Sequence, residues 1–130
     1  MNIPVATFSI VAYDPGRQEW GVAVQSKFLA CAAVVSWARA DAGAVATQSF
    51  ANVAYGADGL DMMARGATAE ETIRDLTTAD PQPNQRQVGV VDRQGRAAAY
   101  TGPECYDWAG HIVGDGFACQ GNILGPGTVE

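Results

Sequence analysis

The sequence predicts an α+β protein built on largely antiparallel sheet. Segments with strand character form two hairpins ahead of two predicted helices and resume after them, a separation typical of α+β proteins. The predicted strands are apolar on both faces, as in V-A-V and V-G-V-V, which favours two stacked sheets or one sheet covered on both sides. With 130 residues, 48% of them hydrophobic, the chain can form one domain with its own core. We expect residues 1–130 to be that domain, with residues 1–6 as a lead-in.

The first predicted hairpin joins strands at residues 7–14 and 19–27. Both segments are rich in β-branched and aromatic residues. The D-P-G sequence at residues 14–16 predicts a turn, because proline fixes φ and glycine permits a positive φ. The start of the first strand therefore meets the polar Q-S-K end of the second.

The register of this hairpin determines which polar residues meet. A four-residue loop between the strands places Thr7 opposite Ser26, with Gln25 and Lys27 beside it. A slip of one residue would put Gln25 or Lys27 opposite Thr7 instead. In each register Thr7 faces a polar residue.

A second hairpin is predicted from residues 34–39 and 44–50, after a connection of small residues at 28–33. Its second strand also ends in hydroxyl and amide side chains, T-Q-S. After the helices, residues 87–92 and 96–100 form a third predicted hairpin. The Gly-rich remainder contains short strands near 110–113 and 117–120.

Two helices are predicted in the middle of the chain. The first covers residues 55–65, although two glycines within it weaken the prediction. The second begins after Thr68, which forms a capping box with Glu71, and ends at Asp80, which precedes a proline.

Composition excludes several classes of partner. The formal net charge is −6 and the basic residues are scattered, so we expect no nucleic-acid or anionic membrane partner. No apolar run is long enough to span a bilayer. An odd number of cysteines without a disulfide framework indicates a cytoplasmic protein. Cys31 lies in an apolar run and is expected to be a small buried hydrophobe.

No cofactor or metal is expected. The sequence contains no phosphate-binding loop, dinucleotide fingerprint or nucleophile elbow. Cys105, His111 and Cys119 do not have the spacing of a zinc site.

Eight short motifs in order carry a family resemblance. They are T-F-S-I-V-A-Y-D, G-V-A-V-Q-S-K-F-L-A, W-A-R-A-D-A-G-A-V-A-T-Q-S, Y-G-A-D-G-L, R-Q-V-G-V-V-D, T-G-P-E-C, W-A-G-H and Q-G-N. From Thr7 to about Leu124 the chain resembles an uncharacterised bacterial family, a domain of unknown function placed in the N-terminal-nucleophile (Ntn) hydrolase superfamily. The resemblance implies a four-layer αββα sandwich of two antiparallel sheets between helical layers.

The resemblance also implies that more chain follows. Members of that family continue past Q-G-N with further helices and strands, so a chain ending at Glu130 is expected to be a fragment or a truncated variant, incomplete at the C-terminal side. Two predicted helices are too few to cover two sheets. We therefore expect an exposed apolar sheet face and association of the chain into a homo-oligomer.

An Ntn hydrolase uses the first residue of its mature chain as nucleophile and that residue's α-amine as base. The residue that matches the start of the first strand is Thr7, so the resemblance implies removal of residues 1–6. An α-amine has a pKa of about 8, which suits a base at neutral pH. The expected substrate is a small-molecule or peptide-like amide. A purely structural explanation is that Thr7 opens a strand and its nitrogen stays in a peptide bond.

Other polar residues are candidates for the same site. Ser26 and Lys27 are candidate catalytic residues, because a nearby ammonium lowers an amine's pKa and stabilises an oxyanion. A solvated strand end explains both equally well. The candidate substrate-binding or oxyanion residues are Ser9, Gln25, Gln48, Ser49, Asn52 and His111. His111 could instead be a packed histidine bonded to backbone.

Two other functions remain open. The fold could be a non-catalytic binding or assembly module, which the lead-in before Thr7 favours. The protein could also be a hydrolase that uses Ser26 or His111 while Thr7 stays buried.

Overall fold

A computed structural model describes residues 5–130 as an α+β protein with two four-stranded antiparallel sheets. Residues 1–4 of the expected lead-in lie outside the described residues. The first sheet has the strand order β2-β1-β8-β7 and the second β3-β4-β5-β6. The strands are β1 (Thr7–Asp14), β2 (Glu19–Ser26), β3 (Ser36–Arg39), β4 (Gly43–Ser49), β5 (Arg86–Asp92), β6 (Ala97–Thr101), β7 (Gly110–Gly114) and β8 (Phe117–Asn122). The helices are α1 (Ala32–Val35), α2 (Ala54–Ala64), α3 (Ala69–Ala79) and the 3₁₀ turn η1 (Pro83–Gln85).

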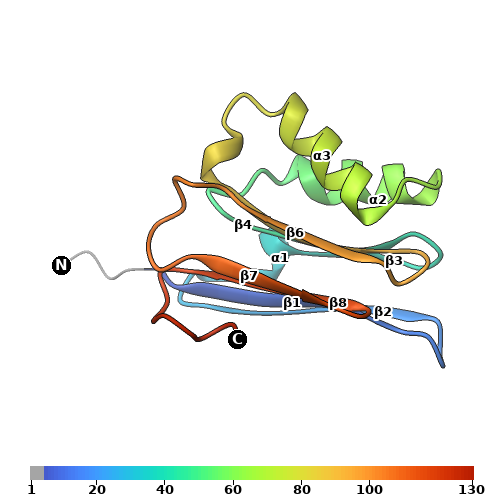
Figure 1. The fold of residues 1–130 in the computed structure, drawn as a ribbon, viewed down its shortest axis with the longest axis horizontal. Coiled ribbons are helices and arrows are strands. Elements are labelled where there is room, and N and C mark those ends of the chain that lie inside the picture. The colour runs from blue at the N-terminus through green and yellow to red at the C-terminus, as the bar shows by residue number, and fades with distance from the viewer. Residues whose placement is uncertain (1–4) are drawn as a thin grey trace.

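The elements stack in three layers (Figure 1). Helices α2 and α3 cover one face of the second sheet, and the other face of that sheet packs against the first sheet. The core between helices and sheet includes Leu60, Met63, Ile73 and Leu76. The apolar core between the sheets includes the small residues Val11, Ala44, Ala46, Val91 and Ala118. Small side chains on facing strands allow the two sheets to approach closely.

The predicted register of the first hairpin is confirmed. Thr7 pairs with Ser26 and Asp14 with Glu19. Side chains alternate across the sheet, so Thr7 and Ser9 point into the molecule, whereas Phe8 and Ile10 point outward.

Both predicted helices are present. The capping box of α3 is formed as expected: Thr68 Oγ1 accepts from the Glu71 backbone N–H, and Glu71 accepts from that of Thr68. Gly56 of α2 lies against the Trp37 ring, and a Cβ there would overlap the ring. This glycine weakened the sequence prediction, yet it permits the close contact between helix and sheet.

The prediction that strand structure begins at residue 34 is wrong. Residues 32–35 form the short helix α1, in which the amides of Val34 and Val35 donate to Cys31 O, and β3 begins only at Ser36. The cavity described below leaves Cys31 half-buried rather than buried. Near the C-terminus, β8 runs two residues beyond its predicted end, to Asn122.

No helix covers the outer face of the first sheet within residues 5–130 (Figure 1). Phe8 of β1 is 45% exposed, Ile10 is 36% exposed and Ile112 of β7 is 39% exposed. Ile10 and Ile112 both pair with Cys119 of β8, so their side chains form one row. The expected exposed apolar sheet face is therefore present. In the described part of the chain, no helix is long and apolar enough to cross a membrane.

Candidate functional site

A cavity of about 700 Å³ opens where β1 begins and where β2, β4 and β8 end. Its lining residues come from all four of these strands and from α1. Because strands of both sheets begin or end here, side chains that are distant in the sequence line the same cavity.

Thr7 and Ser26 lie side by side in this cavity. Thr7 Oγ1 and Ser26 Oγ are 2.8 Å apart, and Thr7 is only 8% exposed. Ser26 Oγ also accepts a hydrogen bond from the backbone N–H of Phe28, at 3.0 Å. The serine hydroxyl is thus held in place beside the threonine hydroxyl.

Asn122 is a third polar neighbour, which the sequence reasoning did not single out as a site residue. It pairs with Thr7 from the opposite side, on β8, and lines the same cavity. Its Nδ2 donates to Gln87 Oε1 at 3.0 Å, and an amide nitrogen carries a second hydrogen. The available signal was the Q-G-N motif, which ends at this asparagine.

Gln48 connects the cavity to a buried polar network between the sheets. Its Oε1 accepts from Ser9 Oγ at 2.6 Å, and its Nε2 donates to Gln87 Oε1 at 2.8 Å and to Gln120 O at 3.3 Å. Gln120 Nε2 in turn donates to Ser9 Oγ. The N–H groups of Gln48 are already engaged, so its amide acts as a structural link beside the cavity.

The network continues to His111, which does not line the cavity. Gln87 Nε2 donates to Thr101 Oγ1, so the Thr101 hydroxyl hydrogen is free to donate to His111 Nδ1, 2.8 Å away. The tautomer of the histidine determines which of these two atoms donates. Burial lowers the pKa of His111 below its ordinary value.

Gln25 and Lys27 are not brought into the cavity. Gln25 pairs with Phe8 and lies beside a smaller hollow of about 240 Å³ on the outer face of the first sheet. Lys27 follows the last residue of β2, is exposed, and forms no ion pair within residues 5–130. The alternation of side chains along β2 accounts for this outcome, because only Ser26 of the Q-S-K run faces inward.

Ser49 lines the cavity at the end of β4, with a backbone φ of 69°. Ile123, which also lines the cavity, has a φ of 56°. Non-glycine residues rarely adopt this left-handed conformation, and such strain clusters at functional sites.

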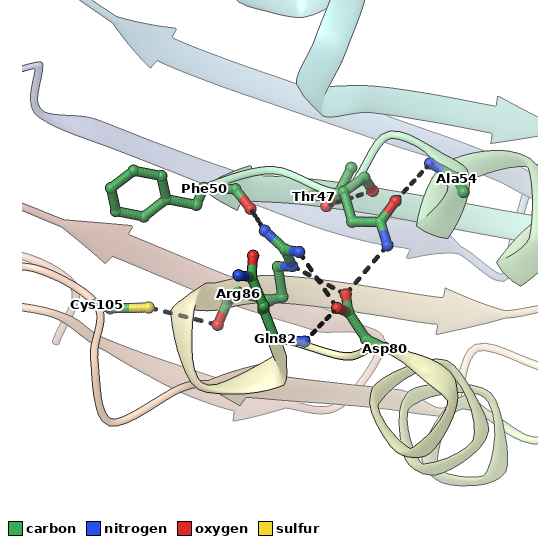
Figure 2. A network of polar contacts seen from close by, with 8 residues as sticks. Thr47, Phe50, Ala54, Asp80, Gln82, Arg86 and Cys105 are labelled. Atoms are coloured by element: carbon green, nitrogen blue, oxygen red, sulfur yellow. Dashed lines mark hydrogen bonds and ion pairs between the residues drawn. The ribbon is translucent and has the colours of Figure 1, made fainter.

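Asn52 points away from the cavity and belongs to a clamp that holds the segment after Ser49. Asn52 Nδ2 donates to Asp80 Oδ2 at 3.0 Å. Arg86 bridges the same carboxylate and the backbone, because Nε donates to Asp80 at 2.9 Å and Nη1 to Phe50 O at 2.6 Å (Figure 2). The Asp80 side chain is fully buried and that of Arg86 is 14% exposed.

The clamp has clear electrostatic consequences. The Arg86 guanidinium is the main cause that holds the pKa of Asp80 far below its usual range, with the Asn52 amide adding to it. Burial and the neighbouring Asp80 carboxylate raise the pKa of Tyr55 well above its ordinary value. The clamp therefore contains a pair that is ionised at neutral pH and that holds the backbone of the cavity wall at Phe50.

No group of three or more His, Cys, Asp or Glu residues is arranged to hold a metal ion in the part of the chain that the structure describes. The chemistry that the cavity offers comes from hydroxyl and amide groups and from the thiol of Cys31. These are suited to nucleophilic attack and to hydrogen bonding with a carbonyl oxygen.

Fold and cavity together define the class of protein. It is an α+β protein with two stacked antiparallel sheets, and a cavity lined partly by polar side chains lies where β1 begins and β2, β4 and β8 end. The chain belongs to the family of unknown function DUF1028, whose model matches residues 7–129. It is similar to the crystal structure of protein SPO2555 from Silicibacter pomeroyi, a member of that family, with 30% sequence identity and a TM-score of 0.90. The match covers 94% of this chain and 54% of the SPO2555 chain, so this chain spans about half the length of SPO2555. Among curated proteins, none matches this sequence.

Proposed function

We propose that this protein is an Ntn-type hydrolase of amide bonds in which Thr7 is the nucleophile after residues 1–6 are removed. The observation that carries the proposal is the position of Thr7 Oγ1, inside the cavity and 2.8 Å from Ser26 Oγ. In this proposal residues 1–130 form one domain of the αββα class. The two stacked sheets and the helices over the second sheet correspond to three of its four layers.

The proposed reaction is acyl transfer through the threonine hydroxyl. The freed α-amine of Thr7 takes the hydroxyl proton as Oγ1 bonds to the substrate carbonyl carbon. Ser26 orients Oγ1, and the second N–H of Asn122 stabilises the oxyanion. The carbon–nitrogen bond breaks and the leaving amine takes the proton. Water then hydrolyses the ester to a carboxylic acid and restores Thr7.

The remaining candidates have supporting roles in this proposal. Lys27 stays at the exposed end of β2 and contributes only a positive potential near the site. Ser9 holds the side chain of Gln48, which lines the cavity, through a hydrogen bond. His111 lies at the far end of the buried network and takes no direct part. Free cysteines fit the expected cytoplasmic location.

The test is mass spectrometry of an active preparation together with threonine variants. We expect an N-terminus at Thr7, and we expect Thr7→Ala to lower amide hydrolysis by at least about 10³-fold because the nucleophile is lost. Thr7→Ser should retain part of the activity. Thr78→Ala, on the exposed side of α3, is the matched control and should be silent. An intact Met1 with full activity that Thr7→Ala leaves undamaged would eliminate the proposal.

A non-catalytic binding module is the second candidate. Val5 lines the cavity, and in the described chain the Thr7 nitrogen is still bonded to Ala6. If the protein only binds, Thr7→Ala should leave ligand affinity and oligomeric state unchanged, and no preparation should hydrolyse amides.

A further inference from the structure

The cavity beside Thr7 has a polar end and an apolar wall. The hydroxyls of Thr7 and Ser26 and the amide of Asn122 lie at the polar end. Much of the remaining lining is apolar and includes Phe28, Val34, Val35, Phe50, Tyr106 and Ile123. Among the described residues that line the cavity, none is Asp, Glu, Lys, Arg or His.

Lys27 is exposed at the end of β2 and does not line the cavity, and the donors of Arg86 are already engaged. Arg86 reaches the wall at Phe50, but its Nε and Nη2 donate to Asp80 and its Nη1 donates to Phe50 O. A charged ligand group inside the cavity would lose hydration without gaining an opposite charge, which is strongly unfavourable. The lining therefore selects against charge of either sign.

Two aromatic side chains of the wall are largely exposed to solvent. Phe50 and Tyr106 form an edge-to-face pair with ring centroids 5.5 Å apart, yet they are 46% and 61% exposed. Large exposed rings that border a cavity of this volume are typical of sites that bury an apolar ligand group.

We infer that the substrate carries an uncharged apolar group, an aryl or branched alkyl group, next to the reacting amide, and that the wall formed by Phe50, Tyr106 and Val34 holds it. The inference rests on the proposed function for the position of the amide, which lies at the polar end. It adds the substrate class, which the chemistry of Thr7 alone does not determine.

Equilibrium binding of three phenylacetamides tests this inference. The probes are 4-isopropylphenylacetamide, which is neutral, 4-carboxyphenylacetamide, which is anionic, and 4-(aminomethyl)phenylacetamide, which is cationic. Calorimetric titration into the Thr7→Ala full chain separates binding from turnover. We expect the neutral probe to bind at least about 10-fold more tightly than either charged probe, since only it leaves no uncompensated charge. Equal or tighter binding of a charged probe, or no binding of the neutral probe, would overturn the inference.

A matched pair of variants locates the binding. Val34→Asp places a carboxylate in the wall, whereas Val53→Asp makes the same change at the exposed start of α2, outside the cavity lining. We expect Val34→Asp to weaken the neutral probe at least about 10-fold and to reverse the preference in favour of the cationic probe. Val53→Asp should stay within about 2-fold of the parent, as expected for a surface site. Equal effects of the two variants would contradict the assignment of the wall.

The two proposals fail in different ways. Absence of an N-terminal Thr7 and of turnover, with charge selectivity intact, would refute the hydrolase and keep the ligand class. Turnover that depends on Thr7 but shows no preference among the three probes would keep the hydrolase and refute the ligand class.

Discussion

Three buried glutamines link the two sheets. Gln48, Gln87 and Gln120 come from β4, β5 and β8, and each is at most 2% exposed. Each amide is both donor and acceptor, so one side chain can bond to several strands at once. Gly89 makes room for this network, because a Cβ at that position would overlap the Gln120 amide. The network holds the side chain of Gln48, which lines the cavity.

Gln87→Leu tests how much this network contributes to the free energy of unfolding. The change removes the acceptor for Gln48 Nε2 and Asn122 Nδ2 and the donor to Gly121 O, and it leaves these groups buried. We expect the free energy of unfolding to fall by at least about 2 kcal/mol, because buried groups without partners are costly. Urea denaturation measures the change. Gln25→Leu, on the exposed outer face, is the matched control and should shift stability by less than about 0.5 kcal/mol. Comparable losses in the two variants would count against a structural role for the network.

At the scale of elements, one ion pair joins the end of α3 to the start of β5. Asp80 follows the last residue of α3, Arg86 begins β5, and their pair also reaches the backbone of Phe50 after β4 (Figure 2). Three elements thus meet at a buried charge pair. Removing one partner of such a pair leaves the other charge without compensation.

Asp80→Asn should lower the free energy of unfolding at pH 7 by about 3 kcal/mol. The folded-state pKa of Asp80 lies below the unfolded value of about 3.9, so its contribution is present above that value and disappears as the pH falls through the folded pKa. The difference between variant and parent should therefore shrink as the pH falls below about 4. The test is to measure the urea denaturation midpoints of parent and Asp80→Asn from pH 7 to pH 2.5.

Asp75→Asn supplies the control for the ion pair. The Arg74–Asp75 pair is exposed, with side-chain exposures of 66% and 51%, so its removal should cost less than about 1 kcal/mol. A difference between Asp80→Asn and the parent that stays constant from pH 7 to pH 2.5 would show that the Asp80 carboxylate is not the group responsible.

At the scale of the whole molecule, the two sheets are covered unequally. Helices α2 and α3 cover the second sheet (Figure 1). On the first sheet, the row of Ile10, Cys119 and Ile112 faces outward. The segment after β8 covers part of this face, since Thr128 and Val129 line the small hollow beside Phe8. Apolar sheet left uncovered favours contact between copies.

We expect the 130-residue chain to associate with increasing concentration, and the double variant Phe8→Thr, Ile10→Thr to reduce that association. Threonine preserves strand propensity and removes apolar surface. Sedimentation velocity over a concentration series measures the average mass. Leu29→Thr, which alters an exposed leucine outside the sheet, should leave association unchanged. A parent chain that stays monomeric throughout the series would contradict the prediction.

The sequence by itself determined the pairing of the first hairpin and the start of α3, although it missed the short helix α1. Turn chemistry at Asp14-Pro15-Gly16 and a four-residue loop set the register that brings Thr7 to Ser26. The capping box at Thr68 and Glu71 set the start of α3. These features depend on residues close in the chain, whose geometry is fixed by a few dihedral angles.

Tertiary structure alone decided the composition of the site. Asn122 reaches Thr7 from more than 100 residues away only because β8 pairs with β1, which no local pattern encodes. The same pairing geometry excludes Gln25 and Lys27, since one strand shows alternate residues to opposite faces. Gln48 was a candidate substrate-binding or oxyanion residue, but contacts from three other strands occupy its amide. A side chain's chemistry is visible in the sequence, whereas its partners depend on how distant strands are arranged.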